Sequence, residues 1–162
     1  MHYVIILGSN QGDKNALIDS ALHILSQKVG KLIKQSHKYE TAPWGFESQQ
    51  NFYNQVAIFK SELSPRDFLN CSLETEKELG RIRSSSEDSR YTDRPIDIDI
   101  LFCDDLVYKD AQLEIPHPRI HQRRFVLVPL VEIIPEYIHP CLLKSMLVLL
   151  SECQDSMAVD LV

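Results

Sequence analysis

Two amphipathic helical segments, each lying between short apolar runs, constrain the fold of this chain most. In residues 13–29 the apolar side chains recur at helical spacing, and Gly30 is a natural helix stop. A second helix is predicted to begin with Pro65 at its first position, after a serine with capping-box spacing, and to run to Gly80. Each helix follows one apolar run and precedes another.

The predicted strands are "YVIILG" before the first helix, "KLIKQSHKYET" and "FYNQVAIFK" between the helices, and "RPIDIDILF" after the second. The order β-α-β-β-α-β is that of a ferredoxin-like sandwich, an antiparallel sheet with helices packed on one face. A helical tail is predicted at the C-terminus, with short helices around 128–134 and 142–152. The fold class is therefore α+β, with predicted loops at 42–50 and 81–94.

Length and composition fit one domain, residues 1–162, with a sizeable core. A net charge of −6 argues against indiscriminate nucleic-acid binding, and every apolar run is too short to cross a bilayer. The N-terminus shows no secretory signal pattern, and the four cysteines have neither C-x-x-C nor zinc-type spacing. We expect reduced, structural thiols in a cytoplasmic protein that works as a monomer.

In "RPIDIDILF", residues 94–102, isoleucines alternate with Asp97 and Asp99, which predicts a strand with one buried face. Side chains at i and i+2 share a face at roughly 6–7 Å, and two bare carboxylates that close raise one of their pKa values. A divalent cation removes the repulsion, because Mg²⁺ takes one or two carboxylates together with substrate phosphates. The alternative is a solvent-exposed face whose aspartates pair with arginines.

Arginine is unevenly distributed, since seven of the eight lie between Arg81 and Arg124. Its planar fork matches phosphate or carboxylate oxygens, so the pattern predicts a local anion site. The polar loop before the Ile/Asp strand supplies Arg81, Arg83, Arg90 and Arg94. A loop this long and polar predicts a mobile lid over a polyphosphate, with a solvated charged loop as the alternative.

A second cluster of histidine and arginine lies in "PHPRIHQRRFVLVPL", which holds His117, Arg119, His121, Arg123 and Arg124. Anion binding explains this cluster better than isolated structural histidines do. The segment "LGSNQGD" lacks the Walker and Rossmann fingerprints, so it is interpreted as a glycine turn into the first helix. The aromatic residues Trp44, Phe46, Phe52 and Phe125 fit either the core or stacking on a flat ligand.

Taken together, the segments resemble the 6-hydroxymethyl-7,8-dihydropterin pyrophosphokinase family of folate biosynthesis. The resemblance runs from residue 3 to about 135, through "LGSNQGD", "YETAPWGF", "FYNQV", "GRIR", "RPIDIDIL" and "PHPRIHQRRFVLVPL". It implies transfer of a pyrophosphoryl group from the co-substrate ATP to the pterin hydroxymethyl oxygen, with AMP leaving. Phosphoryl transfer mainly needs in-line positioning and cations on the developing charge, which carboxylates, metal and arginines supply.

The resemblance also implies roles for individual residues. Two Mg²⁺ ions would be held by Asp97 and Asp99, with Asp99 also counted among the catalytic residues. The catalytic loop would contribute Arg81, Arg83, Arg90 and Arg94. The ATP site would be lined by Glu76, Ile100, Glu114, His117 and Arg123. The pterin would be bound by Thr41, Trp44, Gly45, Phe52, Asn54, Tyr91 and Phe125.

This chain departs from the family pattern in its loop and at one aromatic position. The family commonly has R-W-G-P-R before the strand, where this chain has "RYTDR", and the segment 84–89 is longer than in many members. Phe52 stands where a tyrosine is common. Two alternatives remain, a non-catalytic ferredoxin-like domain that binds Mg²⁺–nucleotide for regulation and a kinase that transfers only the γ-phosphoryl group. Pterin-dependent AMP formation separates the three.

Overall fold

The computed structural model describes residues 1–82 and 92–162. Within these residues, six strands form one antiparallel sheet in the order β5-β1-β4-β3-β8, and β2 also pairs with β4. The strands are β1 (His2–Ser9), β2 (Lys31–Gln35), β3 (Tyr39–Thr41), β4 (Phe52–Lys60), β5 (Asp97–Cys103) and β8 (Asp160–Leu161). With β2 and β3 as one unit, this is the strand order of the predicted ferredoxin-like sandwich, so the fold class is confirmed.

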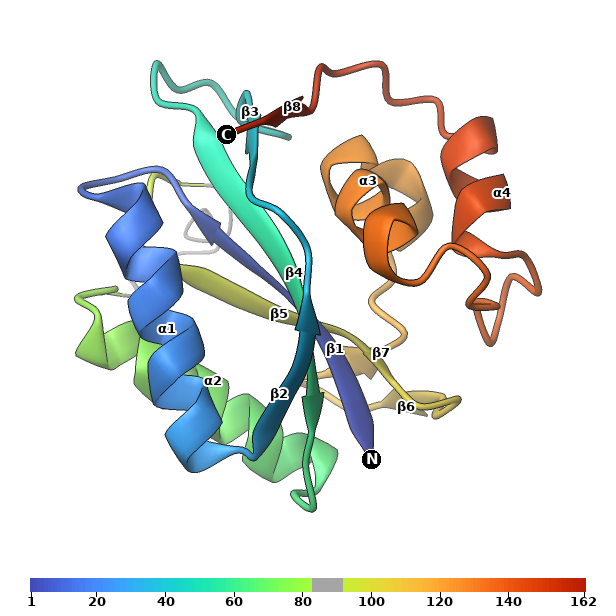
Figure 1. Ribbon diagram of the computed structural model, residues 1–162, viewed down its shortest axis with the longest axis horizontal. Helices are drawn as coiled ribbons and strands as arrows, with labels where there is room; N and C mark the ends of the chain where they lie inside the picture. Colours follow the sequence, from blue (N-terminus) through green and yellow to red (C-terminus); the bar gives the residue numbers. More distant parts are fainter. Residues whose placement is uncertain (83–91) are drawn as a thin grey trace.

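Helices cover both faces of this sheet (Figure 1). On one face, α1 (Lys14–Lys28) and α2 (Pro65–Glu78) enclose a core with Ile5, Leu7 and Phe59 from the strands. On the other face, α3 (Arg124–Ile133) and α4 (Met146–Glu152) enclose a second core. The two helices of the βαββαβ unit share one face as predicted, and the predicted tail forms the second layer.

The first two helices begin and end where the sequence predicts. The carboxylate of Asp13 accepts a hydrogen bond from the backbone N–H of Ala16 at 3.0 Å, which caps α1. Gly30 follows this helix with a φ of 136°, and a Cβ there would lie 2.2 Å from the Lys60 carbonyl oxygen. Only glycine fits that position without displacing the backbone of β4.

The predicted strand over residues 31–41 is divided in two, because Ser36 interrupts the ladder. Its Oγ accepts a hydrogen bond from the Val56 N–H at 3.0 Å, and its carbonyl accepts one from the Gln55 side chain at 2.6 Å. A register shift between Leu32 and Lys34 adds a bulge. β2 and β3 therefore both pair with β4, on either side of this break.

The later elements differ from prediction mainly in their ends. α3 begins at Arg124 instead of residue 128, and α4 begins at Met146 instead of 142 because Ser145 caps it by accepting from the Val148 N–H at 3.2 Å. The 3-10 turn η2 (Ile120–Gln122), the hairpin of β6 (Tyr108–Lys109) with β7 (Glu114–Ile115), and β8 were not predicted. In the described residues no helix is both long and apolar enough to cross a membrane.

Candidate active site

Strand β5 presents its two aspartates on the face that α3 and α4 cover. Ile96, Ile98 and Ile100 enter the core beneath α1 and α2, so Asp97 and Asp99 point to the opposite side. Position 97 pairs with Gly8 at the end of β1, which places the aspartates where β1 leads into its loop. The alternation in the sequence thus separates a core face from a face that carries two carboxylates.

Two arginines hold the carboxylate of Asp97 from different segments. Arg81, just after α2, contacts Oδ1, and the Arg94 guanidinium lies 3.2 Å from Oδ2. Arg81 also lies 3.1 Å from Glu76 on α2, and the same Glu76 oxygen accepts the Ile98 N–H at 2.8 Å. A buried ion network therefore ties α2 to the start of β5 and fixes the orientation of Asp97.

The negative charge of Asp99 is compensated less by neighbouring arginines than that of Asp97. Burial and the neighbouring Asp97 raise the pKa of its carboxyl to about 7, although Arg123 and Arg94 act in the opposite direction. Such a pair of carboxylates gains from additional positive charge. Mg²⁺ commonly binds one or two carboxylates together with phosphate oxygens and water, so the donor set fits that ion.

A candidate anion position lies just before α3, where Arg123 interacts electrostatically with Asp97 and Asp99. Within the described part of the chain, Nε of Arg123 is buried and has no hydrogen-bond partner. Burial also lowers the pKa of this guanidinium. Burial and the charge of Arg123 lower the pKa of His117 to about 4, so its ring is neutral at pH 7, and its Nδ1 accepts the Arg119 N–H at 3.1 Å. A phosphate oxygen would supply the partner that Nε lacks.

Residues of β3, β4 and the loop between them bring polar groups and aromatic rings together. The Asn54 amide donates to Thr41 Oγ1 at 2.9 Å, and both side chains are buried. Phe52 lies edge-on to Phe46, with ring centroids 6.0 Å apart, and the Arg94 guanidinium lies 5.4 Å from the Phe52 ring. An amide, a hydroxyl and an aromatic face together suit a planar heterocycle with polar edges.

Aromatic side chains also lie at the start of α3. The Arg123 guanidinium lies 4.6 Å from the Trp44 ring centroid and 5.7 Å from that of Phe125. The loop after β3 and the first turn of α3 therefore meet through this arginine. Gly45, next to Trp44, is exposed and has a φ of 82°, a conformation that favours glycine.

Other predicted site residues stand apart from this network. The Ile100 side chain is buried in the core, and Glu114 on β7 pairs with Lys109 at 3.4 Å. Their predicted roles at ATP stay predictions. Glu76, by contrast, belongs to the ion network through its pair with Arg81, and its predicted role at ATP also stays a prediction. The predicted residues Arg83, Arg90 and Tyr91 lie outside the described residues, as does most of the predicted lid, the loop 81–94.

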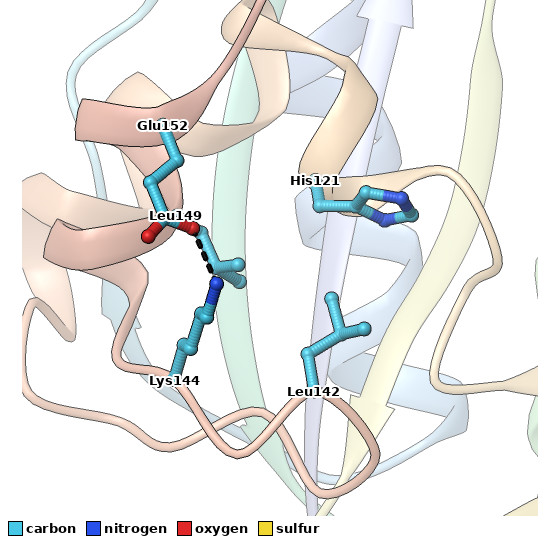
Figure 2. Close-up of a pocket in the computed structure, with 5 residues that line it drawn as sticks. All are labelled: His121, Leu142, Lys144, Leu149 and Glu152. Atoms are coloured by element: carbon cyan, nitrogen blue, oxygen red, sulfur yellow. Dashed lines mark hydrogen bonds and ion pairs between the residues drawn. The ribbon is translucent and has the colours of Figure 1, made fainter.

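His121, from the same predicted cluster as His117, faces a different cavity. Figure 2 shows it opposite the exposed Lys144–Glu152 ion pair, whose charged atoms lie 2.7 Å apart. This cavity has a volume of about 220 Å³, and its lining also includes Leu142 and Leu149. None of these residues belongs to the aspartate network, so His121 is separated from the anion position that its sequence neighbours form.

Sequence analysis missed the role of Asn10, which it interpreted as part of a glycine turn. The buried Asn10 amide donates to Asp93 Oδ1 at 2.6 Å and to the Gln50 carbonyl at 3.5 Å, and its Oδ1 accepts the Arg94 N–H at 2.7 Å. It thus joins the ends of the loops at 42–51 and 81–94. The signal available in the sequence was an asparagine at a strand end, which is typical of side-chain bonds to backbone.

Comparison with known proteins assigns the family. A family model of 7,8-dihydro-6-hydroxymethylpterin-pyrophosphokinase (HPPK) matches residues 4–135. The Porphyromonas gingivalis 2-amino-4-hydroxy-6-hydroxymethyldihydropteridine pyrophosphokinase is 47% identical over 137 residues, which are 83% of this chain and 90% of that protein. The protein of the same name from Aquifex aeolicus is 40% identical over 140 residues, 86% of this chain and 84% of its own length.

Solved structures agree on the fold. A crystal structure of an HPPK-DHPS in complex with substrates aligns with a TM-score of 0.74 over 93% of this chain, at 16% identity. The wild-type Plasmodium falciparum HPPK-DHPS with pteroate aligns equally well, at 20% identity. This chain spans 43% and 42% of those two chains. From the family match and the curated relatives, this chain belongs to the 7,8-dihydro-6-hydroxymethylpterin-pyrophosphokinase family, enzymes of pyrophosphoryl transfer.

Proposed function

We propose that this chain transfers the pyrophosphoryl group of ATP to the hydroxymethyl oxygen of 6-hydroxymethyl-7,8-dihydropterin and releases AMP. The observation that carries the proposal is that Arg94 lies 3.2 Å from Asp97 and 5.4 Å from the Phe52 ring, while Asp97 and Asp99 both interact electrostatically with Arg123. Such a transfer needs two substrates held side by side and positive charge at the phosphates between them. The relatives' names give the pterin acceptor and the pyrophosphoryl transfer, and ATP as the donor is part of the proposal.

Mg²⁺ would be held by Asp97 and Asp99, and we infer two ions. Mg²⁺ commonly takes its remaining ligands from substrate phosphates and water. When bound, the ions neutralise charge on the phosphates. The Arg81 and Arg94 contacts fix the Asp97 carboxylate before substrate arrives.

The side chains around the aspartates would divide the remaining work. Arg123 and the neutral His117 would bind phosphate oxygens, and Arg94 would lie between the phosphates and the ring of Phe52. Residues Arg83 and Arg90 would add charge from the catalytic loop. The transferred pyrophosphoryl group contains both the β and the γ phosphorus atoms. Several arginines can therefore share the negative charge that develops on its oxygens in the transition state.

The pterin would be held by polar groups at its edge and aromatic rings on its faces. Thr41 and Asn54 offer hydroxyl, amide and backbone groups, and both side chains are buried. Phe52 and Phe125 would stack on the two faces of the ring, with Trp44 and Gly45 in the adjoining loop. Tyr91 would approach from the catalytic loop. A ring without matching polar edges would leave these buried groups without hydrogen-bond partners. The site would therefore select for the pterin.

A product assay with a matched pair of variants tests the proposal. ATP, Mg²⁺ and 6-hydroxymethyl-7,8-dihydropterin should yield AMP and the pterin diphosphate, and nothing should form without the pterin. Asp99→Asn should lower turnover by roughly 10²–10³ fold, since it removes a charged group at the phosphates, while the exposed Asp105→Asn should not change it.

Three results would contradict this reading. ADP as the nucleotide product would indicate a simple kinase, and nucleotide binding without any turnover would indicate a regulatory domain. Normal turnover in Asp99→Asn would contradict the proposal that Asp99 binds Mg²⁺. We further infer a cytoplasmic monomer, for which a dimer mass in sedimentation equilibrium would be the contrary result.

A further inference from the structure

After α4, residues 153–162 form an extended segment, here called the strap, that runs past α3 to the far edge of the sheet (Figure 1). Asp155 lies near its start, and its Oδ2 accepts the backbone N–H of Arg124 at 3.0 Å. Its other oxygen accepts the Met157 N–H at 3.0 Å, which holds the carboxylate in place. At the other end, β8 pairs with β3, and the Val162 N–H donates to the Lys38 carbonyl at 3.1 Å.

The contact at Arg124 supplies what the start of α3 lacks. A helix leaves its first backbone N–H groups without partners inside the helix, and an acidic or hydroxyl side chain usually accepts from one of them. The residue before α3 is Arg123, whose side chain makes no capping hydrogen bond, and the first turn has no acidic residue. A carboxylate from a distant part of the chain therefore holds this turn.

The turn that Asp155 holds carries two predicted site residues. Arg123 and Phe125 flank Arg124 in the sequence, and the guanidinium of Arg123 lies between the rings of Phe125 and Trp44. Trp44 follows β3, the strand on which β8 pairs. The strap thus contacts both elements that meet in the stack of Trp44, Arg123 and Phe125, which we call the aromatic stack.

We propose that the strap positions the aromatic stack for substrate binding and that Asp155 is its positioning residue. The proposal rests on the function proposed above, because it assigns the strap a task at that site. Asp155 touches no substrate in this scheme and acts through the backbone of Arg124. Without it, the first turn of α3 would spend part of the time frayed, and only the ordered fraction would bind.

This scheme predicts a division between binding and rate. When a substrate binds only the ordered fraction, its apparent Kd rises by the inverse of that fraction, while the bound complex and its kcat stay the same. Loss of a helix cap commonly changes an equilibrium by about five-fold. Asp155→Ala should therefore raise the pterin Kd and KM by up to about five-fold, with kcat within about two-fold of wild type.

Three variants make the test specific. Asp155→Asn keeps one acceptor oxygen, which can accept the Arg124 N–H while the Met157 N–H loses its partner. It should therefore restore part of the lost affinity, which a requirement for negative charge alone would not allow. Glu152→Ala removes the exposed ion pair with Lys144 in the same region and should behave as wild type. Trp44 is the chain's single tryptophan, so acrylamide quenching of its emission, measured without substrate, should rise in Asp155→Ala only.

The quenching measurement separates this proposal from the proposed reaction. If the wild-type protein makes no pterin diphosphate, the reaction fails while Trp44 quenching still reports on the strap. If Asp155→Ala has a lower Tm but wild-type quenching and pterin Kd, the contact is only structural and the proposal is overturned. Should Asp155→Ala not fold, Leu161→Pro disrupts the pairing of β8 with β3 instead, and unchanged quenching there would overturn it.

Discussion

Replacing Arg81 by methionine should destabilise the protein more than any exposed arginine substitution. Its guanidinium contacts Glu76 at 3.1 Å and Asp97, and it donates to the Ile96 carbonyl at 3.3 Å. The side chains of Arg81 and Glu76 are 6% and 2% exposed, and that of Asp97 is 19% exposed. The variant therefore leaves one fully buried and one largely buried carboxylate without this partner.

The size of the loss follows from what the two carboxylates keep. Removing one partner of a buried ion pair typically costs about 3–5 kcal/mol. Asp97 keeps Arg94 at 3.2 Å, and Glu76 keeps the Ile98 N–H at 2.8 Å. We therefore expect the lower end, about 3 kcal/mol. With a urea m-value of about 2 kcal/mol/M, the unfolding midpoint should fall by roughly 1.5 M.

Urea unfolding at pH 7, followed by far-UV circular dichroism, measures this change. Arg66→Met is the matched control, since Arg66 is 41% exposed and pairs with Asp110 at the surface, and its loss should stay within about 1 kcal/mol. Combining Arg81→Met with Glu76→Gln should cost less than the sum of the two single changes. A loss for Arg81→Met as small as that of the control would show that the Glu76–Arg81–Asp97 network does not stabilise the fold.

The remaining predictions concern recognition, stacking and pH. Gly8→Ala would place a Cβ 3.1 Å from Asn54 Oδ1, so the pterin Kd should rise about three- to ten-fold in calorimetry, with ATP binding unchanged. Phe125→Ala should raise the pterin Kd by a similar factor through lost stacking, and unfolding of the variant would instead make Phe125 a core residue. Burial lowers the pKa of His139, whose Nδ1 accepts the Cys141 N–H, below its ordinary 6.5. Below pH 6.5 the unfolded chain then binds more protons than the folded one, so the free energy of unfolding should decrease as the pH is lowered. In urea titrations at several pH values, His139→Gln should show a smaller decrease, and a pH dependence identical to that of the wild type would contradict this prediction.

Periodicity in the sequence was sufficient to predict the central βαββαβ unit. The helices at 14–28 and 65–78 follow from apolar spacing, capping residues and stop glycines, all of which are local signals. The break at Ser36 was not predictable, because it depends on a hydrogen bond to the partner strand. β8 was missed for a related reason, since a two-residue strand has no periodicity and exists through its pairing with β3.

The site shows the same division between local and distant causes. The two aspartates on one strand face were readable from alternation, and the surplus of arginine indicated an anion. The sequence could not show that Arg81 and Arg94 both serve Asp97, or that Asn10 and Asp155 hold elements far from them in sequence. Such side chains are recognised only once the fold brings their partners together.

In the proposed function, Asn10 would make the ATP and pterin sites thermodynamically dependent on each other. Its buried amide bonds to Gln50, at the end of the loop that would adjoin the pterin, and to Asp93 and Arg94, at the end of the arginine-rich loop. A ligand that moves the end of one loop would change the hydrogen bonds that Asn10 makes to the end of the other loop. Linkage then requires that ATP alter the pterin affinity by the same factor by which the pterin alters that of ATP. Cooperativity between the substrates would thus be independent of the order in which they bind.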